Sequence, residues 1–131
     1  TAIYLACRDI AFESDDAFVD DAYLKNKKLL NSPLYRSLFL ILTKERVVKM
    51  GASAFGIMHK GLELKTNTSA RHIEEGGEWD IISPPHLVPP LIARCYGTAL
   101  RAAAEIAGLP AMHVKVEVTS PTVTRIILWP Q

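Results

Sequence analysis

Residues 91–107 read LIARCYGTALRAAAEIA, a segment in which alanine, the strongest helix former, recurs throughout. Pro89-Pro90 precedes this segment and Gly108-Leu109-Pro110 follows it, and such residues commonly begin and end a helix. We therefore predict one continuous helix over Leu91–Ala107. A glycine in a helix interior, such as Gly97, costs about 1 kcal/mol. Its presence predicts that another backbone or a ligand approaches the helix closely.

Segments that alternate apolar and polar residues flank this helix on both sides, as half-buried strands do. After the helix, Met112–Thr119 alternates strictly, Ser120-Pro121 forms a turn, and Thr122–Trp129 returns. This pattern predicts an antiparallel hairpin. Before the helix, three shorter segments predict a small antiparallel meander: Leu62–Thr66, Arg71–Glu75 and Glu78–Ser83.

The N-terminal part of the chain favours helices. Ser14 is typical of an N-cap, and the acidic residues after it and the lysines at the far end complement a helix macrodipole. Phe18, Ala22 and Leu29 are expected to supply the buried stripe of this surface helix. For the preceding segment, Thr1–Glu13, the pattern does not distinguish a strand from a helix.

A further helix is predicted to begin at Asn31-Ser32-Pro33, with proline at its first position. Leu34, Leu38, Ile41 and Leu42 recur at helical spacing, so Pro33–Leu42 is predicted to be an apolar core helix. Apolar residues return at helical spacing over 47–58, so two helices with a break near residue 43 or one kinked helix both fit. Gly61 is expected to cap this part in the left-handed conformation.

The order of helices, strands, long helix and strands predicts the α+β class. We expect an antiparallel sheet of about four or five strands, packed against the long helix of the C-terminal half and an N-terminal helical layer. The other face of the sheet would be exposed to solvent or covered by a second subunit. The length of 131 residues, with no repeat or linker, predicts a single domain over 1–131, with a helical extension at 1–31.

The amino-acid composition limits the classes of partner that we expect for this protein. Lys and Arg number 15 and Asp and Glu 14, so the net charge of +1 gives no electrostatic argument for nucleic acid or a membrane surface. No uncharged apolar run approaches the ~20 residues that span a bilayer. Cys7 and Cys95 are expected to be reduced and buried. These features predict a soluble, cytoplasmic protein.

The sequence holds no motif that supports an enzyme or a metal site. There is no G-x-S-x-G, P-loop or G-x-G-x-x-G motif, no Cys-x-x-Cys, and no HxxxH pair among His59, His72, His86 and His113. His59 lies near the end of an apolar helical pattern, where it could ligate a haem iron. The alternative is a histidine that the helix dipole favours in a last turn. No cofactor is therefore expected, apart from haem at His59.

Apolar residues with a few polar or aromatic groups suggest a ligand site between the long helix and the sheet, because ligand pockets are mostly apolar with a few placed polar groups. The same residues also describe an ordinary packed core. The candidate ligand-binding residues are Phe55, Met58, His59, Trp79, Cys95, Tyr96 and Gly97.

Several segments together resemble a Myxococcus-type family of uncharacterised proteins. They are SPLYRSLF at 32–39, FGIMHKG at 55–61, GTALRAAAEIAG at 97–108 and the closing hairpin that ends in Trp129. That family is similar to the four-vinyl-reductase domain, the small TRAPP vesicle-tethering subunits and, more distantly, the H-NOX haem domains. The resemblance covers the family-like core over 32–129.

The resemblance implies a small α+β domain that binds an apolar small molecule, an acyl chain or a protein partner, often as a dimer, without catalysis. The chain departs from these relatives at two places. Residues 112–131 contain none of the cysteines common near the C-terminal strands of the vinyl-reductase type, which puts metal binding in doubt. Tyr35-Arg36-Ser37 does not reproduce the H-NOX Tyr-x-Ser-x-Arg signature, so haem binding rests on His59 alone.

Two functions follow as hypotheses. The first is a non-enzymatic, regulatory domain that binds an apolar small molecule between the long helix and the sheet. The second is a dimeric scaffold or adaptor that acts through protein–protein contacts. The second predicts an exposed apolar strip from Leu38, Phe39 and Leu40.

Overall fold

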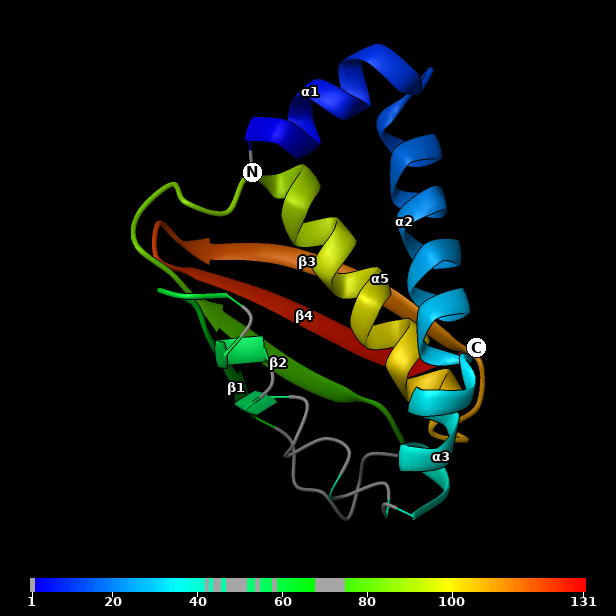
Figure 1. The fold of residues 1–131 in the computed structure, drawn as a ribbon. Coiled ribbons are helices and arrows are strands. Elements are labelled where there is room, and N and C mark those ends of the chain that lie inside the picture. The colour runs from blue at the N-terminus through cyan, green and yellow to red at the C-terminus, as the bar shows by residue number, and fades with distance from the viewer. Residues whose placement is uncertain are drawn as a thin grey trace.

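The computed structural model describes residues 2–41, 43, 46, 52–53, 55–57, 59–67 and 75–131. Its helices and strands follow in the order α1 (Ala2–Ala11), α2 (Asp15–Leu30), α3 (Pro33–Ile41), β1 (Glu63–Thr66), β2 (Gly77–Ile82), α5 (Pro90–Ile106), β3 (Met112–Ser120) and β4 (Val123–Pro130). Figure 1 shows α5 crossing one face of the sheet and α2 packed beside α5. The α+β class predicted from the order of the segments is confirmed.

The sheet is antiparallel, and its four strands lie in the order β1-β2-β4-β3. The predicted closing hairpin is present as β3 and β4. β1 and β2 correspond to the first and third segments of the predicted meander, and they pair directly with each other. Between them, residues 71–74 of the predicted middle strand lie outside the described residues, and Glu75 belongs to no strand. β2 pairs directly with β4, so the meander and the hairpin join into one sheet.

The two faces of the sheet differ in chemistry. The face toward α5 carries the buried core, which consists of Leu64, Trp79, Ile81, Leu109, Met112, Ile126 and Leu128. On the opposite face, Lys65, Asp80, Arg125 and Glu117 lie opposite one another in successive strands, so cations and anions alternate across the sheet. Such cross-strand pairs of opposite charge stabilise a solvated face. The hydrophobic core therefore lies on the helical side of the sheet.

Helix α5 lies directly on β3 and β4, and Gly97 is the point of closest approach. A Cβ atom at Gly97 would lie 2.9 Å from Val114 Cγ2 and 3.0 Å from Val116 Cγ2. The predicted close approach at this glycine is therefore to the valines of β3. Since α5 runs unbroken from Pro90 to Ile106, the predicted long helix is also confirmed.

Helix α2 packs along α5 and is held there by a half-buried carboxylate, that of Glu105. Ser14 caps α2 as predicted, because its Oγ accepts a hydrogen bond from the Ala17 N–H at 3.1 Å. Phe18 and Val19 are buried, and Tyr23 donates from its hydroxyl to Glu105 of α5 at 2.5 Å. Helix α2, which lies in the N-terminal part of the chain, is thus part of the packed domain.

Three predictions about the N-terminal half are wrong. Pro33–Leu42 was predicted to be a core helix, but α3 buries none of its residues, because it continues from the end of α2 instead of covering the sheet (Figure 1). Leu29 was assigned to the buried stripe of α2 but is 54 % exposed. Cys7 was expected to be buried but is exposed, since α1 also buries no residue.

The remaining segments add two observations. The undecided N-terminal segment is the helix α1, and Gly61 has the predicted left-handed backbone with φ of +86°. Most of the predicted helix over 47–58 lies outside the described residues, although residues 52–53 and 55–57 are helical. Within the part of the chain that the structure describes, no helix is long and apolar enough to cross a membrane.

Candidate ligand-binding site

Three of the predicted site residues form one aromatic cluster. The Phe55 and His59 rings stack with their centroids 4.5 Å apart and an interplanar angle of 26°. Tyr96 of α5 meets both rings edge to face, with centroid distances of 5.2 Å to Phe55 and 5.1 Å to His59. These edge-to-face and stacked arrangements are favourable for aromatic pairs. The cluster therefore joins the segment before β1 to the first half of α5.

Local geometry explains how the segment before β1 presents these rings. Phe55 and His59 are one helical turn apart, and the His59 N–H donates to the Phe55 carbonyl oxygen at 2.9 Å. His59 Nδ1 lies 3.1 Å from the same oxygen. Because a carbonyl oxygen only accepts, a hydrogen bond here has its proton on Nδ1, and in the neutral ring Nε2 then carries the lone pair. Gly61 then ends the helical segment.

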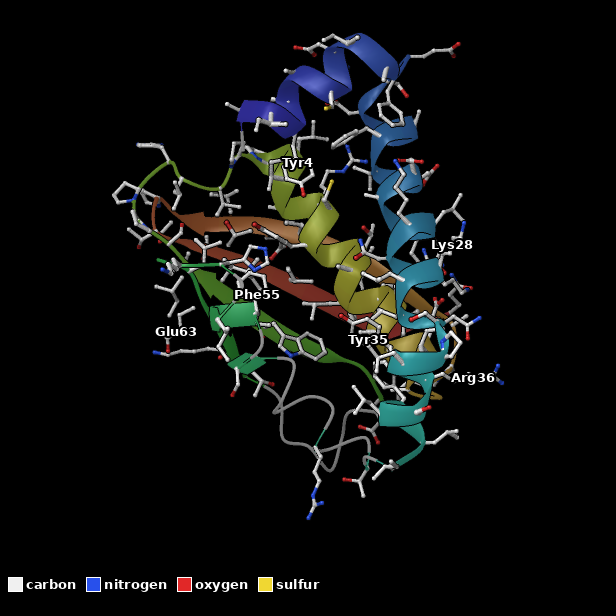
Figure 2. The ribbon with its side chains drawn as sticks, viewed as in Figure 1. Tyr4, Lys28, Tyr35, Arg36, Phe55 and Glu63 are labelled. Carbon is white, nitrogen blue, oxygen red and sulfur yellow. The ribbon has the colours of Figure 1, made fainter. Side chains whose placement is uncertain are left out.

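The cluster lies at the margin of the hydrophobic core. Phe55 and Tyr96 pack against the buried core residues, which include Trp79 of β2. Figure 2 shows Phe55 between β1 and α5. Phe55, His59 and Tyr96 are each half-buried, whereas Trp79 is buried. The three rings are therefore accessible in part.

The other predicted site residues have different positions. Gly97 faces the valines of β3, so α5 and the sheet leave no room for a ligand at that point. Cys95 is half-buried on α5, and burial raises the pKa of its thiol. Met58 lies outside the described residues. A site between the middle of the long helix and the sheet is therefore not available at Gly97, and the aromatic cluster marks the accessible margin.

Polar groups of the cluster can take part in hydrogen bonds. Burial raises the pKa of the Tyr96 phenol, so its hydroxyl stays protonated near neutral pH and can donate a hydrogen bond. The His59 lone pair on Nε2 supplies an acceptor. Among the described residues, no group of three or more His, Cys, Asp or Glu side chains is placed to hold a metal ion. Haem ligation by His59 stays a prediction.

Sequence reasoning missed a second polar centre, at Glu105. Its carboxylate accepts hydrogen bonds from the Tyr23 hydroxyl, from Arg101 Nε at 2.9 Å and from Lys27 Nζ at 3.1 Å. Burial alone would raise the pKa of Glu105, but these donors outweigh burial and lower it to about 2. In the sequence, Tyr23 and Lys27 are four residues apart, and so are Arg101 and Glu105. Each pair therefore lies on one side of a helix. Nothing in either pair indicated that they would meet, so this centre joins two helices without a sequence signal.

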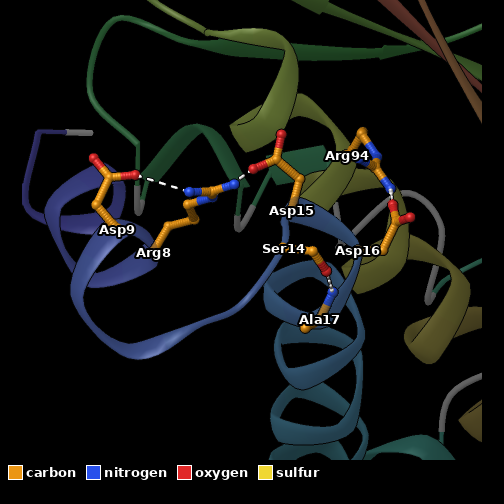
Figure 3. A network of polar contacts seen from close by, with 7 residues as sticks. All are labelled: Arg8, Asp9, Ser14, Asp15, Asp16, Ala17 and Arg94. Atoms are coloured by element: carbon orange, nitrogen blue, oxygen red, sulfur yellow. Dashed lines mark hydrogen bonds and ion pairs between the residues drawn. The ribbon is translucent and has the colours of Figure 1, made fainter.

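Exposed ion pairs surround the junction of α1 and α2 (Figure 3). Arg8 contacts Asp9 and Asp15, and Arg94 of α5 contacts Asp16. The Asp16 side chain is 81 % exposed. Surface pairs of this kind contribute little to stability, so they orient the helices and carry no site.

The apolar strip that the adaptor hypothesis predicted is present in part. Leu38 and Leu40 are 45 % and 81 % exposed, respectively. Phe39 is half-buried. Two of the three residues predicted for the strip are therefore exposed.

Comparisons with family models, with curated proteins and with solved structures find no match to this chain.

Proposed function

We infer that the protein is a non-enzymatic, regulatory domain that binds an apolar or aromatic small molecule at the cluster of Phe55, His59 and Tyr96. One observation carries this proposal: three predicted site residues from two distant segments meet with centroid distances of 4.5 to 5.2 Å. The ligand would enter at the margin between α5 and the segment before β1, because the interface at Gly97 is filled.

The chemistry of the cluster supports this function. Ligand sites are mostly apolar and carry a few polar groups that fix the orientation of the ligand. The rings offer apolar faces, while the Tyr96 hydroxyl and the lone pair on His59 Nε2 offer one donor and one acceptor. A planar apolar molecule with one polar group fits this combination.

The test is a titration with N-phenyl-1-naphthylamine, a neutral apolar dye whose fluorescence rises on binding. We expect saturable binding by the wild type and about tenfold weaker binding by Tyr96→Leu, which removes the ring and the hydroxyl, since tenfold corresponds to ~1.4 kcal/mol. Tyr35→Leu is the matched control, because it makes the same change at an exposed tyrosine of α3, outside the cluster. Equal binding by wild type and Tyr96→Leu, or a loss only in Tyr35→Leu, would refute the proposal.

Native mass spectrometry of the purified protein supplies a second measurement. A bound small molecule that is present in the wild type and absent from Tyr96→Leu would support the site and give the mass of the ligand. A bound molecule that survives Tyr96→Leu in full would place the site elsewhere.

A further inference from the structure

The net charge of +1 conceals a strong separation of charge along α2. Its first half carries Asp15, Asp16, Asp20 and Asp21. From residue 25 to residue 41 the chain reads KNKKLLNSPLYRSLFLI, with Lys and Arg but no Asp or Glu. The end of α2 and the whole of α3 therefore form a locally basic part of the molecule.

The same part exposes apolar side chains. On α3, Leu34 is 71 %, Leu40 81 % and Ile41 79 % exposed. Leu34, Leu38 and Ile41 follow one another at helical spacing and so share one side of the helix. Around the helix, Leu40 lies between Arg36 and Ile41, whereas Leu38 lies on the side away from Arg36. We call the surface formed by Lys28, Arg36, Leu40 and Ile41 the basic end.

The cations of this surface are available to a partner. Lys25 pairs with Asp21 and Lys27 with Glu105, but Lys28 and Arg36 have no ion pair among the described residues. Figure 2 shows Lys28 and Arg36 on the outer side of the molecule, away from the sheet. Arg36 lies one helical turn from Leu40, so a cation with no ion pair to any described residue borders the most exposed leucine of α3.

We propose that the basic end binds an anionic lipid surface. A helix with exposed apolar side chains and flanking cations lies in the interface of a membrane, where the apolar side chains enter the acyl region and the cations meet the headgroups. In the basic end, Leu40 and Ile41 supply exposed apolar side chains, and Lys28 and Arg36 supply the cations. This inference is independent of the small-molecule site.

A second copy of the chain fits this surface poorly. In a symmetric dimer the same patch faces itself, so two surfaces of net positive charge would be brought together. Such an arrangement is repulsive. An anionic occupant removes this repulsion, and a lipid surface also buries Leu40 and Ile41.

The test is co-sedimentation with vesicles of phosphatidylcholine alone and of phosphatidylcholine mixed with phosphatidylglycerol in equal parts. We expect the wild type to bind the mixed vesicles, to bind phosphatidylcholine weakly, and to lose binding as salt increases. Lys28→Glu/Arg36→Glu should weaken binding by at least about tenfold, because each cation near an anionic surface contributes roughly fivefold. Lys65→Glu/Lys115→Glu, the same charge change on the sheet, should bind like the wild type.

Leu40→Glu is a second variant that removes apolar contact while leaving the packed core untouched, and it should also weaken vesicle binding. Equal binding to both kinds of vesicle, or wild-type binding by Lys28→Glu/Arg36→Glu, would overturn the proposal. So would binding to polyglutamate but not to vesicles, which would assign the surface to an acidic protein. A concentration-dependent dimer that Leu40→Glu abolishes, without vesicle binding, would assign it to a second copy.

Discussion

Helices α3 and α5 are both rich in apolar residues, but they have opposite environments. α5 lies between the sheet and α2 and buries Ile92, Ala93, Gly97, Thr98 and Ala102. α3 has apolar residues at the same helical spacing and buries none of them. The difference in burial comes from tertiary packing, since α5 is followed by the strands on which it packs, whereas α3 extends the end of α2. An apolar helical pattern therefore predicts a helix, but not which surface covers it.

The largest expected effect on stability is the difference between truncating a buried isoleucine and truncating an exposed one. Ile126 of β4 is 0 % exposed and Ile41 of α3 is 79 % exposed. Ile126→Ala should lower the free energy of unfolding by about 3 kcal/mol, through lost burial and a cavity in the core. Ile41→Ala should change it by less than about 0.5 kcal/mol. Urea unfolding followed by circular dichroism measures both, and a large loss in Ile41→Ala would mean that α3 is covered.

The next effect concerns the carboxylate that joins α2 to α5. Glu105 is 10 % exposed at its side chain and accepts hydrogen bonds from three side chains. Glu105→Gln should lower the free energy of unfolding by about 2 kcal/mol, the range for hydrogen bonds to a charged group. Glu63→Gln on the exposed surface of β1 is the matched control and should have a far smaller effect. Equal losses in both variants would contradict a role for Glu105 in joining the helices.

The same carboxylate predicts a pH dependence. Folding lowers the pKa of Glu105 from its ordinary value of 4.5 to about 2. Its contribution is therefore complete above about pH 4.5 and is lost as the pH falls toward 2, where the carboxyl is protonated in both states. Wild-type stability should fall over this window more steeply than that of Glu105→Gln. Parallel pH profiles of the two proteins, measured by thermal unfolding, would refute this assignment.

Sequence reasoning succeeded where structure is set by neighbouring residues. The helix over Leu91–Ala107, the cap at Ser14 and the turn at Gly61 depend on local propensity, and each is present. The strands before and after α5 follow from alternation, which also assigns their buried faces. Gly97 was recognised as a point of close approach, but the pattern did not identify the sheet as the element that approaches.

Other features depend on contacts between distant segments, and the sequence did not predict them. Phe55, His59 and Tyr96 were named from residue type alone, and only the packing of α5 beside the segment before β1 brings their rings together. Glu105 belongs to no motif, and only the packing of α2 along α5 brings it to Tyr23 and Lys27. The exposure of α3 was missed because an apolar stripe was taken as burial.

A smaller effect is expected at Gly97. Alanine is favoured over glycine in a helix by about 1 kcal/mol, but its Cβ would lie 2.9 Å from Val114 Cγ2. The valine side chain is short and stiff, so we expect Gly97→Ala to lower the free energy of unfolding by about 1 kcal/mol. A double-mutant cycle with Val114→Ala, measured by urea unfolding, tests this contact. The double variant should lose less free energy of unfolding than the sum of the losses in the two single variants. Stabilisation by Gly97→Ala would show that α5 can move away from β3.

The smallest effect is expected at the junction of α1 and α2, where contacts are polar and exposed. Asp16→Asn breaks the contact with Arg94, but the Asp16 side chain is 81 % exposed, so water already competes for both groups. We expect the free energy of unfolding to fall by less than about 0.5 kcal/mol, and the difference to vanish at high salt. Thermal unfolding at low and high salt checks this. A loss as large as that of Glu105→Gln would place the acidic start of α2 among the contacts that hold the domain together, because exposed pairs alone cannot supply it.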